Sequence, residues 1–150
     1  MDRSAINQAL AKLGRAYGAR LGGPDAVVAL LRPLLENEAQ ECFVALLLNG
    51  KHRITGFAEI SRGTLTASLV HPREVFGPAL RQGAAAIIVA HNHPSGEPEP
   101  SSEDLGVTKR LRDAGALLGV PLLDHLILGE HGRFTSLAAL GHCRSPEVRP

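Results

Sequence analysis

The sequence contains few aromatic residues and almost no net charge. It has no tryptophan, one tyrosine and four phenylalanines, and its 16 basic and 15 acidic residues leave a formal charge of +1. So few aromatic rings offer little surface on which nucleobases could stack. A near-neutral chain also lacks the broad excess of lysine and arginine that binds phosphate groups. The composition therefore argues against a dedicated nucleic-acid-binding domain.

Long hydrophobic runs and paired cysteines are also missing. The longest strictly apolar runs are residues 42–48 and 84–90, whereas a membrane-spanning helix needs about 18 to 20 apolar residues. The opening residues MDRSAINQAL show neither the apolar core nor the cleavage site of a secretory signal, so we expect a cytoplasmic protein without a membrane segment. Cys42 and Cys143 lie far apart and outside any CxxC pattern. We therefore expect both to be free thiols.

The length and the apolar content fit one globular core. The chain has 150 residues, of which 44% are hydrophobic and 21% charged, and a chain of this size buries about 70% of its unfolded surface on folding. We divide it into an N-terminal helical segment (residues 1–37), a main domain (residues 38–142) and a flexible tail (residues 143–150).

Hydrophobic spacing predicts alternating helices and strands. Helical periodicity and start signals predict helices at residues 4–19, 24–35, 72–82 and 101–118, with Pro33 straining or ending the second. Apolar runs predict strands at residues 42–48, 54–60, 63–70, 84–90, 120–128 and 133–135, the first two joined by a tight turn at Asn49-Gly50. The pattern indicates an α/β or mixed α+β class with a mixed sheet under helices.

The segment from residue 91 to residue 104 carries the clearest chemistry. His91 and His93 stand two apart at the end of a buried strand, so both imidazoles point to one face. Asp104 falls on the first turn of the following helix, and the intervening loop of three prolines and a glycine can fold back toward the histidines. Two histidines and a carboxylate are the ligand set of catalytic zinc sites, which leave a fourth position for water.

These residues also have structural interpretations. A histidine at the end of a strand is commonly a surface or hydrogen-bonding group. The pattern from Ser101 to Asp104 is equally that of a capping box, in which the acid also favours the helix dipole. The two interpretations are compatible, since a carboxylate in a capping box can still face a metal.

The spacing H-x-H, seven residues, S-x-x-D resembles the motif of the JAMM (JAB/MPN) metalloenzyme family. Further motifs resemble its RadC branch, and the similarity covers roughly residues 38–140. The resemblance implies the JAMM fold, a mixed sheet flanked by helices with a layout like that of cytidine deaminases, in residues 38–142. It also implies a Zn²⁺ site made by His91, His93 and Asp104. The RadC-like motifs are GTL (63–65), HPREVF (71–76), HNHPSG (91–96), TKRL (108–111) and LLDHLILG (122–129).

The resemblance assigns catalytic roles to two further residues. Glu41, directly before the first apolar run, matches the family glutamate that holds water on the metal, first as a base and then as an acid. Its alternative is an exposed charge at the start of a strand, and Glu59 is a weaker candidate for the same role. Ser101 would donate its hydroxyl to a developing oxyanion, or would only cap the helix.

Two neighbouring residues of a later strand leave a question open. Asp124 and His125 alternate along the predicted strand at 120–128 and so point to opposite faces. One of them could orient a metal ligand, or both could be structural. Other catalytic patterns are absent from the sequence, namely HExxH, GxxxxGK[ST], GxSxG and the deaminase PCxxC.

The leading hypothesis is a zinc-dependent peptidase or isopeptidase acting on a peptide or protein substrate. The alternative is a DNA repair-associated protein of the RadC type that binds or cleaves DNA, although Glu97, Glu99 and Glu103 would repel phosphates. A third hypothesis is an interaction module without activity. RadC proteins typically carry a longer N-terminal region with a helix-hairpin-helix element, so we expect its contribution to be reduced here. The apolar segment 26–35 could serve the core or a homodimer contact. The basic residues that favour DNA are Arg3, Lys12, Arg15, Arg20, Arg32, Lys109, Arg110 and Arg112.

Overall fold

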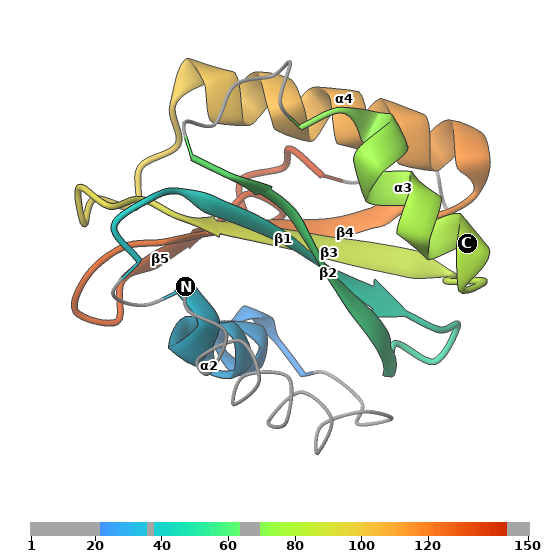
Figure 1. Cartoon of the computed structure of the whole chain (residues 1–150), viewed down its shortest axis with the longest axis horizontal. Coiled ribbons are helices and arrows are strands. Elements are labelled where there is room, and N and C mark those ends of the chain that lie inside the picture. The colour runs from blue at the N-terminus through green and yellow to red at the C-terminus, as the bar shows by residue number, and fades with distance from the viewer. Residues whose placement is uncertain (1–21, 36–37, 64–69, 144–150) are drawn as a thin grey trace.

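The computed structural model describes residues 22–35, 38–63 and 70–143. In this part of the chain, five strands form one mixed sheet in the order β2-β1-β3-β4-β5, in which only β3 and β4 run parallel (Figure 1). The predicted class, a mixed sheet flanked by helices, is confirmed. The elements are α2 (Pro24–Leu35), β1 (Cys42–Leu48), β2 (Ile54–Arg62), α3 (Pro72–Arg81), β3 (Ala86–Asn92), α4 (Ser102–Leu118), β4 (Leu122–Leu128) and β5 (Phe134–Ser136).

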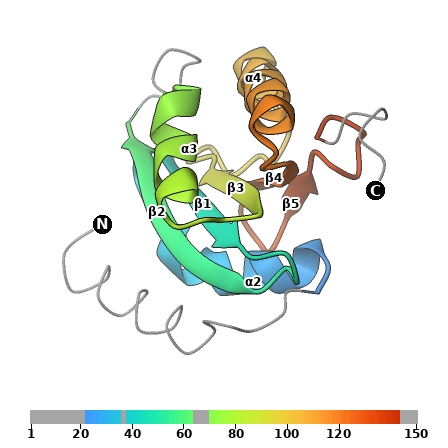
Figure 2. The same ribbon diagram turned by 90° about the vertical axis from the view of Figure 1, so that its right-hand side faces the viewer.

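Helices cover both faces of the sheet. Helices α3 and α4 lie on one face and α2 on the other (Figures 1 and 2). Every residue of β1 and β3 is buried, because both strands are central and covered on both sides. This arrangement explains why the longest apolar runs of the sequence, residues 42–48 and 84–90, coincide with β1 and overlap most of β3.

Helix α2 belongs to the core of the described chain. Its apolar side chains pack on the sheet, so the segment that the sequence left open as core or contact surface lies in the core. Pro33 lies inside the last turn, and the helix ends two residues later at Leu35. Arg32 then donates hydrogen bonds to the carbonyls of Gly129 (3.0 Å) and Arg133 (3.3 Å), which fastens the helix to the connection after β4.

The predicted hairpin between β1 and β2 is confirmed, but the prediction of a tight turn at Asn49-Gly50 is wrong. The strands separate after the pair Leu48 and Ile54, so the connection spans residues 49–53. The residue with positive φ is His52 (58°) rather than Gly50. The Asn49 carboxamide oxygen accepts hydrogen bonds from the backbone N–H groups of two later turn residues, at 2.9 and 3.0 Å. These side-chain bonds add to two backbone bonds of the connection, from the Asn49 N–H to the Arg53 carbonyl (3.0 Å) and from the His52 N–H to the Asn49 carbonyl (2.9 Å).

Several element boundaries differ from the prediction by two residues. Strand β3 covers residues 86–92 rather than 84–90, because the Ala84 N–H still bonds to the Ala79 carbonyl at the end of α3. The shift places His91 inside the strand. The predicted helix at 4–19, most of the predicted strand at 63–70 and most of the tail lie outside the described residues.

Membrane spans and disulfides are not found in the described ranges. None of the helices in this part of the chain is long and apolar enough to cross a membrane. Both Cys42 and Cys143 are buried, free cysteines, as predicted. Burial raises the pKa of the Cys143 thiol to about 12, so this thiol is held in its unreactive protonated form.

Candidate metal centre

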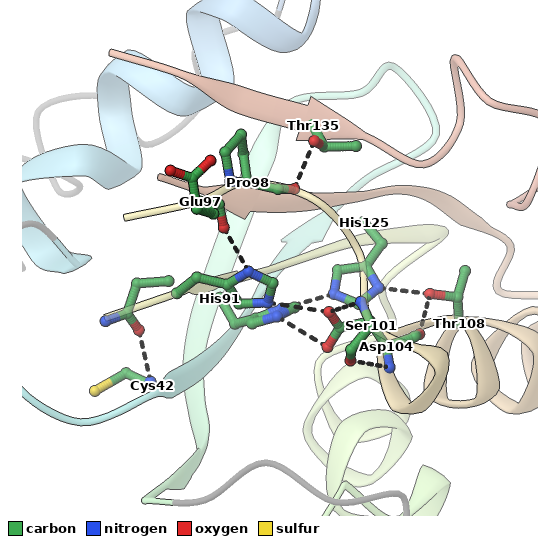
Figure 3. Close-up of polar contacts among 11 residues, drawn as sticks. Cys42, His91, Glu97, Pro98, Ser101, Asp104, Thr108, His125 and Thr135 are labelled. Carbon is green, nitrogen blue, oxygen red and sulfur yellow. Dashed lines mark hydrogen bonds and ion pairs between the residues drawn. The ribbon is translucent and has the colours of Figure 1, made fainter. Parts of the chain in front are cut away.

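The histidines and the aspartate meet where the parallel strands end. Helix α4 connects β3 to β4, so its N-terminus lies at the carboxyl ends of both strands, the edge at which α/β sheets place their ligands. His91 belongs to β3 and Asp104 lies in the first turn of α4 (Figure 3). His93 follows the last residue of β3. One atom from each side chain lies within 4.8 Å of the others. The structure therefore brings together all three predicted metal ligands.

Asp104 serves both the helix and the cluster. The Ser101 hydroxyl oxygen accepts a hydrogen bond from the Asp104 N–H (3.1 Å), and Asp104 Oδ2 accepts one from the Ser101 N–H (2.8 Å). This is the capping box that the sequence predicts. The same carboxylate places Oδ1 3.1 Å from His91 Nε2 and Oδ2 3.0 Å from His93 Nε2. The cap thus fixes the carboxylate that both imidazoles face.

The loop after β3 sets the orientation of His93. His93 Nδ1 lies 2.7 Å from the Glu97 carbonyl. A carbonyl only accepts, so Nδ1 carries a proton, and Nε2 is the ring nitrogen of His93 that faces Asp104. The loop itself is held by β5 and the residue before it, since Arg133 donates to the Gly96 carbonyl (3.0 Å) and the Thr135 hydroxyl to the Pro98 carbonyl (2.6 Å).

One ring nitrogen of His91 is the clearest indication of a ligand at this site. Its side chain is fully buried, and its Nε2 is the buried side-chain nitrogen or oxygen that lacks a hydrogen-bond partner within the described ranges. Asp104 Oδ1 lies 3.1 Å away, but not in the direction of a hydrogen bond. Such unsatisfied buried atoms are rare in native proteins, and an unplaced ion is one of their ordinary explanations. The observation fits a cation held between this nitrogen and the carboxylate.

The electrostatics of the cluster favour an ionised Asp104. Burial raises the pKa of its carboxyl group, but the imidazoles of His91 and His93 that face it outweigh burial and hold that pKa well below its usual range. The hydrogen bond with Asp104 in turn raises the pKa of His93. One carboxylate oxygen with two imidazole nitrogens is a donor set suited to zinc and similar divalent transition metals.

Glu41 comes just before β1, next to the residues of β1 that pair with the histidine-bearing end of β3. Phe43 of β1 pairs with His91 of β3, and the two rings stack with centroids 5.8 Å apart. Glu41 comes two residues before Phe43, and continuing the register by two residues sets it opposite His93 on the same face. Its charge also contributes to the raised pKa of His93. A groove of about 360 Å³ runs past Glu41 and Pro94.

Glu59, the alternative to Glu41, belongs to the opposite face. It pairs with Val44, whose side chain lies in the cluster beneath α2, whereas its neighbour Ile60 packs against the cluster beneath α3 and α4. The Glu59 carboxylate forms an ion pair with Arg62 at 2.8 Å. The register therefore favours Glu41 as the carboxylate beside the metal ligands.

Asn92, between the two histidines, holds the segment that carries Glu41. Its carboxamide oxygen accepts from the Cys42 N–H (2.7 Å), and its amide group donates to the carbonyls of Gln40 (3.0 Å) and Glu38 (3.4 Å). Because side chains alternate along a strand, Asn92 points away from the face that carries the histidines. The sequence analysis did not single out this residue, although its position inside HNH was a usable signal.

Sequence analysis also missed the contacts behind His91. His91 Nδ1 lies 2.8 Å from His125 Nε2, and His125 Nδ1 lies 2.6 Å from the Thr108 hydroxyl (Figure 3). Of the two residues left open, His125 is thus the one that contacts a candidate metal ligand, His91. Asp124 accepts hydrogen bonds from the Ser136 hydroxyl and the Ala138 N–H, a structural role.

We predict that Asn92→Asp will lower activity without removing the metal. The substitution keeps the acceptor for Cys42 but turns a carboxylate oxygen toward two carbonyls, so the segment around Glu41 shifts. Misplacement by about 1 Å can cost roughly 100-fold in rate, and the lost hydrogen bonds cost about 1 to 3 kcal/mol in unfolding free energy. Denaturant unfolding, metal content and hydrolysis measured together check the prediction.

The matched control is Asn49→Asp in the β1–β2 connection. Among the described contacts, Asn49 uses only its carboxamide oxygen, as an acceptor for Lys51 and Arg53, and aspartate retains that oxygen. This variant should behave like the wild type. Equal activity of Asn92→Asp and Asn49→Asp would show that the hydrogen bonds of Asn92 do not position Glu41.

The fold and the cluster together define an α/β domain with a candidate metal site at the carboxyl ends of its central strands. Comparison with known proteins assigns the chain to a family of JAB domains, which agrees with this fold. A model of the RadC family, described as a RadC-like JAB domain, matches residues 21–142. The chain belongs to this family.

Named relatives carry no established activity in their names. The chain is 47% identical over 146 residues to a UPF0758 protein of Syntrophotalea carbinolica, which covers 93% of this chain and 64% of the relative. It is 49% identical over 122 residues to a UPF0758 protein of Geobacter sulfurreducens, with coverage of 81% and 53%. A UPF0758 protein of Staphylococcus epidermidis is 47% identical over 119 residues, with coverage of 79% and 52%. The chain thus spans between half and two thirds of these relatives.

Proposed function

We propose that this domain is a zinc-dependent hydrolase that cleaves amide bonds in peptide or isopeptide substrates. The observation that carries the proposal is the unsatisfied, buried Nε2 of His91, directed into a cluster with His93 Nε2 and the Asp104 carboxylate. Membership of the RadC-like JAB family supports it, because JAB-like domains often have metal-dependent hydrolase activity and the JAMM resemblance implies amide or isopeptide bonds as the target.

Some residues of the site would bind the metal, and others would transfer protons. His91, His93 and Asp104 would hold the metal, and a zinc ion there supplies Lewis acidity that activates water near neutral pH. Glu41 would accept a proton on its carboxylate and later deliver it to the leaving amine nitrogen. The Ser101 hydroxyl accepts the cap bond through a lone pair, so its proton can still be donated to the substrate carbonyl oxygen.

Charges around the site support a peptide substrate over DNA. Glu97, Glu99 and Glu103 are exposed on the loop and the first turn of α4 that surround the ligands. Carboxylates at this mouth repel phosphate groups and tolerate or attract neutral and basic peptide segments. Lys109 and Arg110 are also exposed, but one helical turn or more beyond Asp104.

Elemental analysis combined with a hydrolysis assay tests the proposal. The purified protein should contain about one zinc per chain, and it should cleave fluorogenic peptides or isopeptide-linked substrates. Chelation should abolish cleavage, and Zn²⁺ should restore it. A protein that folds normally but holds no metal would overturn the proposal. DNA binding that falls steeply with salt, without amide cleavage, would favour the DNA-linked alternative.

A further inference from the structure

A closed chain of hydrogen bonds behind the cluster joins two of the candidate ligands. It runs from His91 to His125 (2.8 Å), from His125 to the Thr108 hydroxyl (2.6 Å), and from that hydroxyl to the Asp104 backbone carbonyl (2.8 Å). Thr108 and His125 are both fully buried. The chain therefore returns to the residue whose carboxylate faces His91 Nε2, and water does not enter it from the bulk.

The direction of each bond follows from what the groups can donate. The Asp104 carbonyl only accepts, so the single hydroxyl proton of Thr108 is used there. The Thr108 oxygen must then accept a proton from His125 Nδ1. Full burial of His125 favours its neutral form. A neutral His125 with its proton on Nδ1 has a lone pair on Nε2.

The same donor and acceptor argument determines which ring nitrogen of His91 carries the proton. Because His125 Nε2 can only accept, His91 Nδ1 must donate, and the second ring nitrogen of His91 is left with a lone pair. The opposite direction of the chain would put a proton on His91 Nε2. That proton would have no acceptor in hydrogen-bonding direction, since Nε2 has no such partner among the described residues. The geometry thus selects one of two proton arrangements with equal numbers of protons.

We propose that Thr108 and His125 are positioning residues that hold His91 in the tautomer with its proton on Nδ1, and so keep its Nε2 lone pair directed at the metal. This inference rests on the metal site of the proposed function. The backbone of one ligand residue thereby sets the tautomer of another, through a threonine one helical turn away.

Thr108→Val is the decisive variant, because valine keeps the shape and removes the hydroxyl. His125 then loses its acceptor, moves its proton to Nε2 and donates to His91 Nδ1, so His91 must carry its own proton on Nε2. We expect a 10- to 100-fold loss of zinc affinity, on the order measured for lost outer partners of metal-bound histidines. Chelator competition with Zn²⁺ measures this loss. Thr108→Ser should restore the affinity to within about threefold, because serine retains the hydroxyl.

Nitrogen-15 NMR of the metal-free protein reads the tautomers directly. In the wild type, His91 and His125 should both be protonated on Nδ1, and in Thr108→Val both should be protonated on Nε2. The matched control is Thr55→Val, which removes another threonine hydroxyl bonded to a carbonyl (Leu47, 3.2 Å) far from the site. It should change neither the zinc affinity nor the tautomers.

Two results would overturn the inference. One is wild-type zinc affinity in Thr108→Val, and the other is a proton on His91 Nε2 in the metal-free wild type. Absence of zinc binding in the wild type would instead refute the proposed function. The NMR spectra would still decide the tautomer in that case, so the two failures are distinguishable.

Discussion

Replacing Asp104 by asparagine is expected to remove the metal and to leave the fold intact. The amide oxygen can still accept the Ser101 N–H that Asp104 Oδ2 accepts now, and the substitution takes a buried charge away. The change in unfolding free energy of the metal-free protein should therefore stay within about 1.5 kcal/mol. A neutral amide is a poor zinc ligand, so the affinity should fall by more than the roughly 100-fold that follows loss of an outer partner.

Two measurements check this expectation. Elemental analysis should find metal in the wild type and not in Asp104→Asn. Added Zn²⁺ should raise the melting temperature of the wild type only, because a ligand stabilises a protein in proportion to its binding of the native state. Asp113→Asn is the matched control, since Asp113 lies on the same helix, is exposed and pairs only with Arg112 among the described contacts. Zinc retained by Asp104→Asn would refute the ligand assignment.

Replacing Glu41 by glutamine should abolish most of the activity while the metal remains bound. Glutamine has nearly the same size and cannot accept the proton, so the rate of hydrolysis should fall by about 10² to 10⁴, the usual contribution of general acid–base catalysis. The cluster of His91, His93 and Asp104 does not use Glu41. Zinc content should therefore match the wild type, and kcat rather than KM should carry the loss.

Glu59→Gln provides the matched control for Glu41→Gln. Glu59 pairs with Arg62 on the other face of the sheet, and its substitution should change activity little. A strong loss of activity in Glu59→Gln, with normal activity in Glu41→Gln, would reverse the assignment of the proton acceptor.

The candidate ligands were predictable because their signals are local. The two-residue spacing of His91 and His93 places both on one face of a strand, and the Ser101 to Asp104 pattern marks the start of a helix. The observed capping box confirms the latter without displacing the carboxylate from the cluster. Short-range rules therefore sufficed for the three candidate ligands and the helix cap between residues 91 and 104, although not for the contacts of Asn92.

Contacts between distant segments were not predictable in this way. His125 reaches His91 only because β3 and β4 pair in parallel with His125 opposite Val89. Thr108 had a usable signal, since it follows Asp104 by one helical turn and a threonine there can bond back to that carbonyl. The prediction of a tight turn at Asn49-Gly50 was wrong because the Asn49 side chain accepts hydrogen bonds from later residues of the same connection. The statistical preference of the Asn-Gly dipeptide for tight turns does not include this alternative.

The loop pinned by Arg133 and Thr135 bears on the thermodynamics of metal uptake. All three ligands come from one short stretch of chain, whose ends are held in β3 and α4 and whose middle is held at β5. The conformational entropy of closing this stretch is therefore lost during folding and not during coordination. Apo and metal-loaded protein should share one backbone, and ion capture should resemble the filling of a rigid chelator rather than coupled folding.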